Sequence, residues 1–138
     1  MYENEALKSF KKKQQDLIDQ LMVQTSKGHI NWDVFDYDKK LINDAVESIS
    51  ASTCKIGNKK FNLVHYVPDN EFSSSDSNGK IYFMEIIDVG TKEVLKRYDS
   101  EDGEKLLENL FEMIKWNQSG LSDTLDEISN LGNEDFDI

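Results

Sequence analysis

The sequence has very few of the residues that cross-link small proteins or interrupt their secondary structure. Its 138 residues include one cysteine, Cys54, and one proline, Pro68. A single cysteine excludes an internal disulfide and a zinc site built from several thiolates, and it fits a reducing compartment. So little proline favours long regular elements over loops. The fold must therefore depend on a hydrophobic core, for which the chain is long enough.

Further absences narrow the class of function. His29 and His65 are the only histidines, and neither has a second histidine or a cysteine at ligand spacing, so we predict no metal site of the zinc type. The sequence has no glycine-rich phosphate loop and no serine nucleophile elbow. No apolar run reaches the roughly 20 residues that cross a bilayer, and no signal-peptide core follows the acidic first residues. We expect a cytoplasmic protein that binds no cofactor and no membrane.

Basic residues are nearly missing from the C-terminal part of the chain. Residues 1–98 contain 15 acids and 14 bases, a net charge of −1. Residues 99–138 contain 12 acids and only Lys105 and Lys115, a net charge of −10, and the two parts sum to −11. A concentrated negative field disfavours nucleic acid as a partner and steers a basic protein toward it.

Four runs of β-branched and aromatic residues predict strands at residues 53–56, 60–67, 81–88 and 93–98. Gly57 and Asn58 form a hairpin signal between the first two runs. Pro68 ends the second run because it has no backbone N–H to donate. The third run has apolar residues at both odd and even positions, as in a central strand with both faces buried. Short connections between neighbouring strands favour an antiparallel meander.

Helical spacing of apolar residues occurs on both sides of these strands. Residues 3–24 predict an amphipathic N-terminal helix, and Gly28 follows as a left-handed C-terminal cap. Residues 38–49 have helical spacing as well. A helix that begins at Asp99 or Ser100 and another that begins at Ser122 carry apolar stripes that we expect to be buried. These stripes are Leu106, Leu107, Leu110, Phe111 and Ile114 in the first helix, and Leu121, Leu125, Ile128 and Leu131 in the second.

The expected fold class is therefore α+β. It consists of an N-terminal helix, a four-stranded antiparallel meander sheet and a C-terminal pair of acidic helices. We expect a single domain over residues 1–132 and an acidic tail at residues 133–138 that frays. The oligomeric state is left open.

Two groups of oxygen-bearing side chains have spacings found in cation sites. Ser74, Asp76, Asn78, Gly79, Ile81 and Glu85 match positions 1, 3, 5, 6, 8 and 12 of a calcium-binding helix–loop–helix motif. A serine at position 1 and a strand around Glu85 favour an ordinary hairpin loop instead. Asp33, Asp36 and Asp38 could bind magnesium or act as an acid–base pair, but they equally suit a helix N-terminus, which we favour.

A thiol nucleophile would need Cys54 and His65 to lie together. Cys54 precedes Gly57 by three residues, whereas His65 follows Asn58 by seven. This offset does not place the two side chains opposite each other in the hairpin. We therefore expect Cys54 to be a structural residue.

The segment at residues 25–32, T-S-K-G-H-I-N-W, resembles a T-x-x-G-x-I-x-W pattern found after the N-terminal helix of small uncharacterised bacterial and phage proteins. In those proteins the tryptophan precedes a strand pair, a further hairpin and an acidic C-terminal helix. This sequence departs from them in the helical spacing at residues 38–49 and in its serine-rich loop. The resemblance implies the fold and a bacterial or phage setting, and it transfers no activity. Physically, the pattern is that of a helix cap, a glycine and two inward apolar residues.

Two hypotheses for function remain. The first is a non-enzymatic protein-binding module of the immunity or inhibitor type, which binds a basic protein through an acidic helical surface. Its candidate residues are Glu101, Glu104, Glu108, Glu112, Asp123, Asp126 and Glu127. The second is a small metal-dependent enzyme that uses the carboxylates of Asp33, Asp36, Asp38 or Glu85. The poverty of catalytic side chains favours the first hypothesis.

Overall fold

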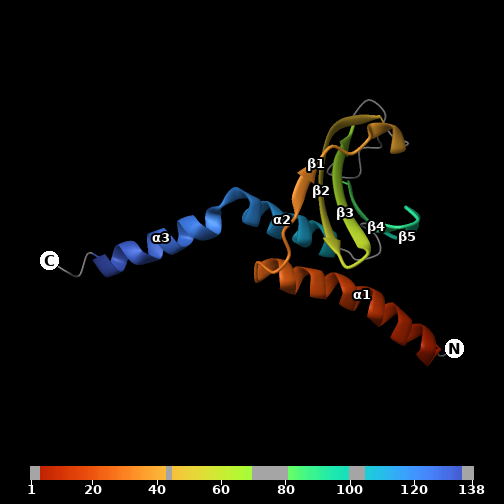
Figure 1. Cartoon of the computed structure of the whole chain (residues 1–138), viewed down its shortest axis with the longest axis horizontal. Coiled ribbons are helices and arrows are strands. Elements are labelled where there is room, and N and C mark those ends of the chain that lie inside the picture. The colour runs from red at the N-terminus through yellow and green to blue at the C-terminus, as the bar shows by residue number, and fades with distance from the viewer. Residues whose placement is uncertain (1–3, 43–44, 70–80, 100–104, 135–138) are drawn as a thin grey trace.

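The chain forms an antiparallel sheet with two helices on one face and a third helix that projects from the body (Figure 1). The computed structural model describes residues 4–42, 45–69, 81–99 and 105–134, with side chains up to Leu131. The elements in chain order are α1 (Glu5–Ser26), β1 (Asp33–Phe35), the 3-10 turn η1 (Lys39–Leu41), β2 (Val46–Ile56), β3 (Lys59–Pro68), β4 (Ile81–Asp88), β5 (Val94–Asp99), α2 (Leu106–Ser119) and α3 (Leu121–Glu134). The α+β class and the order of helices and sheet agree with the sequence-based expectation.

The sheet is a meander in which each strand pairs with the next, in the order β1-β2-β3-β4-β5. All four pairings are antiparallel. The expected hairpin at Gly57 joins β2 to β3, with Ile56 opposite Lys59 and Gly57 at a φ of 61°. The sheet has five strands rather than the four predicted, because the short edge strand β1 pairs with the middle of β2.

The helix predicted over residues 38–49 is wrong. Among the described residues of this range only η1 is helical, and the Asp38 carboxylate caps it by accepting a hydrogen bond from the Lys40 backbone N–H at 2.9 Å. The strand β2 begins at Val46, seven residues earlier than predicted. Its sequence alternates serine with larger residues, and pairing with both β1 and β3 outweighs the helical spacing of its aliphatic residues.

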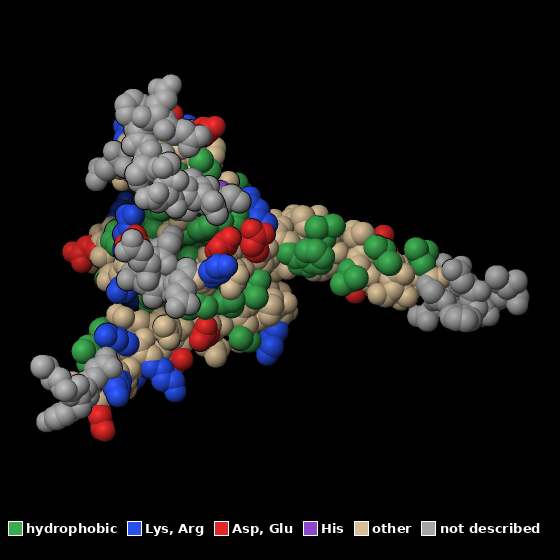
Figure 2. Space-filling view, turned by 180° about the vertical axis from the view of Figure 1, so that it is seen from behind, with side chains coloured by type: hydrophobic (Ala, Val, Ile, Leu, Met, Phe, Trp, Pro, Cys, Tyr) green, Lys and Arg blue, Asp and Glu red, His purple; other side chains and the backbone are tan. Residues whose placement is uncertain are grey.

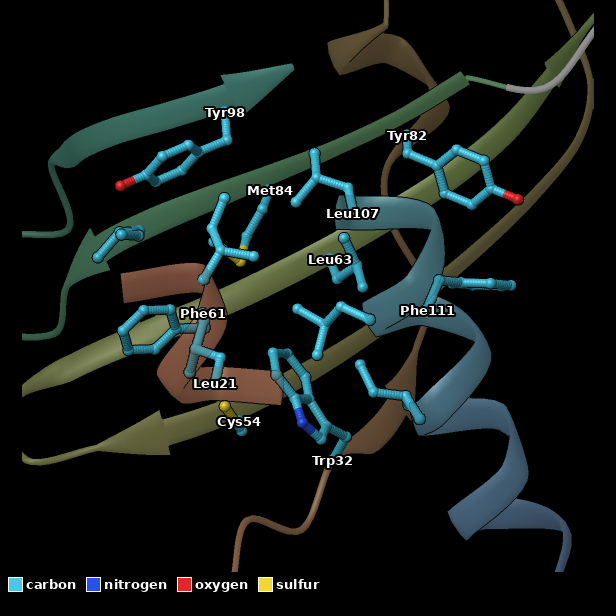
Figure 3. Packing of buried hydrophobic residues seen from close by; sticks show 14 residues of the cluster. Leu21, Trp32, Cys54, Phe61, Leu63, Tyr82, Met84, Tyr98, Leu107 and Phe111 are labelled. Atoms are coloured by element: carbon cyan, nitrogen blue, oxygen red, sulfur yellow. The ribbon is translucent and has the colours of Figure 1, made fainter. Parts of the chain in front are cut away.

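One face of the sheet is covered by α1 and α2. Ile18 and Leu21 of α1 meet Leu107, Leu110 and Ile114 of α2 over the middle of the sheet, and all five side chains are at most 3% exposed. Figure 3 shows these two helices and the central strands directing their side chains into one cluster, with Leu63 and Met84 at its base. The buried stripe predicted for α2 is thereby confirmed.

A smaller cluster covers the other face of the sheet. Val64 and Phe83 are buried there beneath Phe35 and Tyr37. Phe35 is the last residue of β1, and Tyr37 follows it by two residues. The Tyr37 and Phe83 rings meet edge to face at 5.6 Å, and the Arg97 guanidinium lies 4.0 Å from the Phe83 ring centre. Both faces of the central strands are therefore occupied.

A network of hydrogen bonds joins the end of α1 to β2 and to the end of α2. The Trp32 indole N–H donates to the Thr25 hydroxyl at 3.0 Å, and both residues are buried. The Asn117 side-chain amide donates to the Thr25 carbonyl at 2.7 Å. The Gln118 amide donates to the Trp32 carbonyl at 3.1 Å and to the Ser52 hydroxyl at 3.2 Å. Residues 25–32 thus have an architectural role in this chain.

The helix α3 does not pack as predicted. Leu121, Leu125, Ile128 and Leu131 are 43%, 53%, 58% and 56% exposed, because the face of the sheet is already filled by α1 and α2. Gly120, at a φ of 75°, ends α2 and turns the chain away from the sheet.

The bounds of the C-terminal helices also differ from the prediction. The helix α3 continues to Glu134, past the predicted start of the tail at residue 133. Asp99 does not cap α2, since it ends β5, and Ser100 lies outside the described residues.

Substitution of Trp32 by phenylalanine should lower the free energy of unfolding by about 1–3 kcal/mol, because the buried Thr25 hydroxyl loses its hydrogen-bond donor. Urea unfolding followed by circular dichroism measures this change. The matched control is Trp116→Phe, which removes an indole hydrogen bond to Ser122 at an exposed site and should change stability by no more than about 0.5 kcal/mol. Equal effects of the two substitutions would contradict the architectural role of Trp32.

Candidate protein-binding surface

The acids proposed as a binding surface divide into two groups on consecutive helices. The two acids of the first group are one turn apart on α2, and the second group lies on α3. The first consists of Glu108 and Glu112, and the second consists of Asp123, Asp126 and Glu127. Glu101 and Glu104 lie outside the described residues. The structure therefore brings five of the seven predicted residues onto α2 and α3, as two groups rather than one continuous patch.

The α2 group lies against the body of the molecule, beside an aromatic cluster. The Tyr82 ring stacks on His65 with the ring centres 4.6 Å apart, and it meets Phe111 of α2 at 5.5 Å. Burial raises the pKa of Tyr82, and the negative charges of Glu108 and Glu112 raise it further. Glu108 and Glu112 therefore lie close enough to Tyr82 for their charges to act on its hydroxyl.

The α3 group forms one face of the projecting helix. At 100° per residue, Asp123, Asp126 and Glu127 point away from Leu125 and Ile128. All three acids are exposed, and residues 121–134 contain four acids and no base. Among the described residues, the ion pairs are Lys59–Asp88 and Arg97–Asp99 in the sheet, and neither involves α3. We call Asp123, Asp126 and Glu127 the acidic face of α3.

The opposite side of α3 is apolar and equally exposed. We call Leu121, Leu125, Ile128 and Leu131 the α3 stripe. Figure 2 shows it as a row of hydrophobic side chains along the projecting helix. The periodicity of the sequence identifies this stripe, but periodicity alone does not indicate whether another part of the chain covers it. The sequence therefore predicted a buried stripe, and its exposure is known only from the structure.

A short set of polar contacts fixes the start of α3 against the end of α2. The Trp116 indole N–H donates to the Ser122 hydroxyl at 2.6 Å. The Leu121 backbone N–H donates to the Ser119 hydroxyl at 3.3 Å. Because these contacts involve only the junction around Gly120, the rest of α3 carries its acidic face and its stripe clear of the sheet (Figure 1).

The carboxylates of the alternative hypothesis lie on several elements. Asp33 is in β1, Asp38 caps η1, and Glu85 is in the middle of β4, opposite Arg97 of β5. Burial raises the pKa of Tyr37 to about 12, with smaller contributions from the charge of Glu85 and from its hydrogen bond to Tyr37. In the described ranges, no three histidine, cysteine or acidic side chains lie close enough to share a metal ion. Residues 74–79 of the calcium-like loop lie outside those ranges.

The sheet register separates Cys54 from His65. Cys54 lies opposite Phe61, whereas His65 lies opposite Ser50, which precedes Cys54 by four residues in β2. Cys54 is 6% exposed in the main core, and burial raises the pKa of its thiol to about 12. The expectation that Cys54 is a structural residue is consistent with this position.

No family model matches the chain, and comparisons with curated proteins and with solved structures also find no match. None of the helices in the described part of the chain has the length and the apolar composition that a membrane crossing requires.

The burial of Cys54 predicts slow alkylation. With a thiol pKa of about 12, the reactive thiolate is scarce at pH 8, and the side chain has little contact with solvent. Iodoacetamide labelling of the native protein at pH 8 should be at least about 100-fold slower than labelling in urea, where the pKa returns to about 8.5. Mass spectrometry measures both rates. Labelling at similar rates in the two conditions would show that Cys54 is accessible.

Proposed function

We propose that the chain is a non-enzymatic protein-binding module that engages a basic partner protein through the acidic face of α3, with Glu108 and Glu112 of α2 as a flanking group. The observation that supports this proposal best is the exposure of the three α3 acids on a projecting helix without bases. A partner can approach this helix from the side that faces away from the sheet (Figure 1).

The spacing of the three acids favours cooperative attraction of a basic surface. Asp123 and Glu127 are four residues apart, which is about 6 Å along a helix. This separation is shorter than the Debye length of about 8 Å at physiological salt, so the charges act together on an approaching cation.

The chemistry of the surface defines the partner. Lysine and arginine side chains arranged around a concave site would pair with the acids, and nucleic acid and anionic lipid would be repelled. A nuclease or toxin with a basic active site has such a surface, so masking it by an acidic helix is a role of the immunity or inhibitor type. Neutral partners would gain nothing from the acidic face.

Neutralising the acidic face should weaken partner capture. The variant Asp123→Asn/Asp126→Asn/Glu127→Gln keeps the helix and removes three charges from it. In pull-downs from the native host, the immobilised wild-type chain should retain one or more basic proteins at about 0.05 M salt and release them at about 0.5 M. The affinity of the variant for the captured protein, measured by calorimetry, should be at least about tenfold lower.

The matched control removes the same number of charges elsewhere. Asp16, Asp19 and Glu93 are exposed and lie on α1 and before β5, away from α3. The variant Asp16→Asn/Asp19→Asn/Glu93→Gln should bind the captured protein like the wild type. Equal losses in both variants, or capture that is insensitive to salt, would overturn the role of the acidic face.

A further inference from the structure

The α3 stripe requires a cover that the described part of the chain does not supply. A 14-residue helix is marginally stable in water by itself, and most helices gain their stability by burying an apolar face. All four side chains of the stripe are more than 40% exposed. They are contiguous along the helix, which is the pattern of an interaction surface rather than of scattered surface residues.

A second uncovered apolar surface lies at the opposite end of the molecule. We call Glu5–Lys13 the α1 overhang; its side chains are all exposed. Leu7 and Phe10, at 44% and 57% exposure, continue the buried face of α1 at spacings of three and four residues. The overhang ends at Lys13, just before Gln14, whose carbonyl accepts a hydrogen bond from the Tyr98 hydroxyl at 3.1 Å.

The two uncovered helices carry opposite charges. The α1 overhang contains Lys8, Lys11, Lys12 and Lys13 with Glu5 as its one acid, a net charge of +3, whereas α3 has four acids and no base, a net charge of −4. Pairing of α3 with a second α3 would bring together like charges, and pairing of two overhangs would do the same. Pairing of an overhang with α3 brings opposite charges together.

We propose that a second copy of this chain covers the α3 stripe with its α1 overhang, and that the contact is reciprocal in a two-fold symmetric dimer. Within one chain, the overhang and α3 project from opposite ends of the molecule and do not meet (Figure 1). Figure 2 shows hydrophobic side chains on the same face at both projecting ends. In the proposed dimer the long axes of the two copies are reversed, so that each overhang lies on the other copy's α3.

The reciprocal arrangement also buries more surface than self-pairing of α3. Self-pairing of α3 would bury the four aliphatic side chains of the stripe from each copy. The reciprocal contact doubles the number of helix pairs and adds Leu7 and Phe10 of each copy. Because the interface is isologous, it closes at two copies and leaves no stripe for further growth. This inference goes beyond the proposed function, since it uses the apolar side of α3.

Sedimentation velocity of the purified full chain tests the dimer. At micromolar concentration and about 0.05 M salt the wild type should sediment as a dimer. The variants Phe10→Ser and Leu125→Ser/Ile128→Ser change only exposed side chains, so they should fold, and circular dichroism checks this. Each should raise the dimer dissociation constant by at least about tenfold. The control Leu41→Ser, at an apolar side chain 64% exposed elsewhere, should remain dimeric.

Mixing the two variants identifies the pairing. Phe10→Ser retains an intact α3, and Leu125→Ser/Ile128→Ser retains an intact overhang, so the mixture should form a heterodimer through one contact. A monomeric wild type, a Phe10→Ser variant with the dissociation constant of the wild type, or a mixture without heterodimer would overturn the proposal. The purified chain is measured without a partner, so a monomeric result leaves capture by the acidic face untouched, and failed capture leaves the dimer untouched.

Discussion

The packing of α1 and α2 on a single face of the sheet is the constraint on which the rest of the molecule depends. The hydrogen bonds from Trp32 to Thr25, and from Asn117 and Gln118 to the same segment, fix the ends of both helices over β2. Phe35 and Tyr37 pack on the other face, so both faces of the central strands are covered within the described part of the chain. The exposure of α3 follows from this arrangement.

Much of the fold could be predicted from the sequence where local and long-range signals agree. Gly28 and Gly57 have positive φ: the first follows the end of α1, and the second lies in the hairpin whose strands follow from alternation and turn chemistry. The prediction was wrong at residues 46–52, where helical spacing of aliphatic residues competed with strand pairing. The environment of α3 could not be predicted, because a stripe of leucines has the same periodicity whether it packs against its own chain or against another.

The sequence indicates which residues form the candidate site, but it does not indicate how they are arranged. The charge imbalance of the sequence indicates an acidic C-terminal region, and Asp123, Asp126 and Glu127 do lie together on one helix face. Composition does not indicate where these side chains lie in the fold. It therefore could not show that Glu108 and Glu112 lie beside Tyr82, as a group distinct from the acids of α3. The helix α3 thus has a charged side, which we propose binds a basic partner, and an apolar side, which we propose binds a second copy.

Hydrogen exchange of the backbone amides measures the exposure of α3. In the chain diluted until it is monomeric, the backbone amides of α3 should exchange much faster than those of α2, because only α2 is held by the core. Exchange of α3 as slow as that of α2 would mean that the body of the same chain covers the helix. That result would contradict both the acidic face and the stripe as free surfaces.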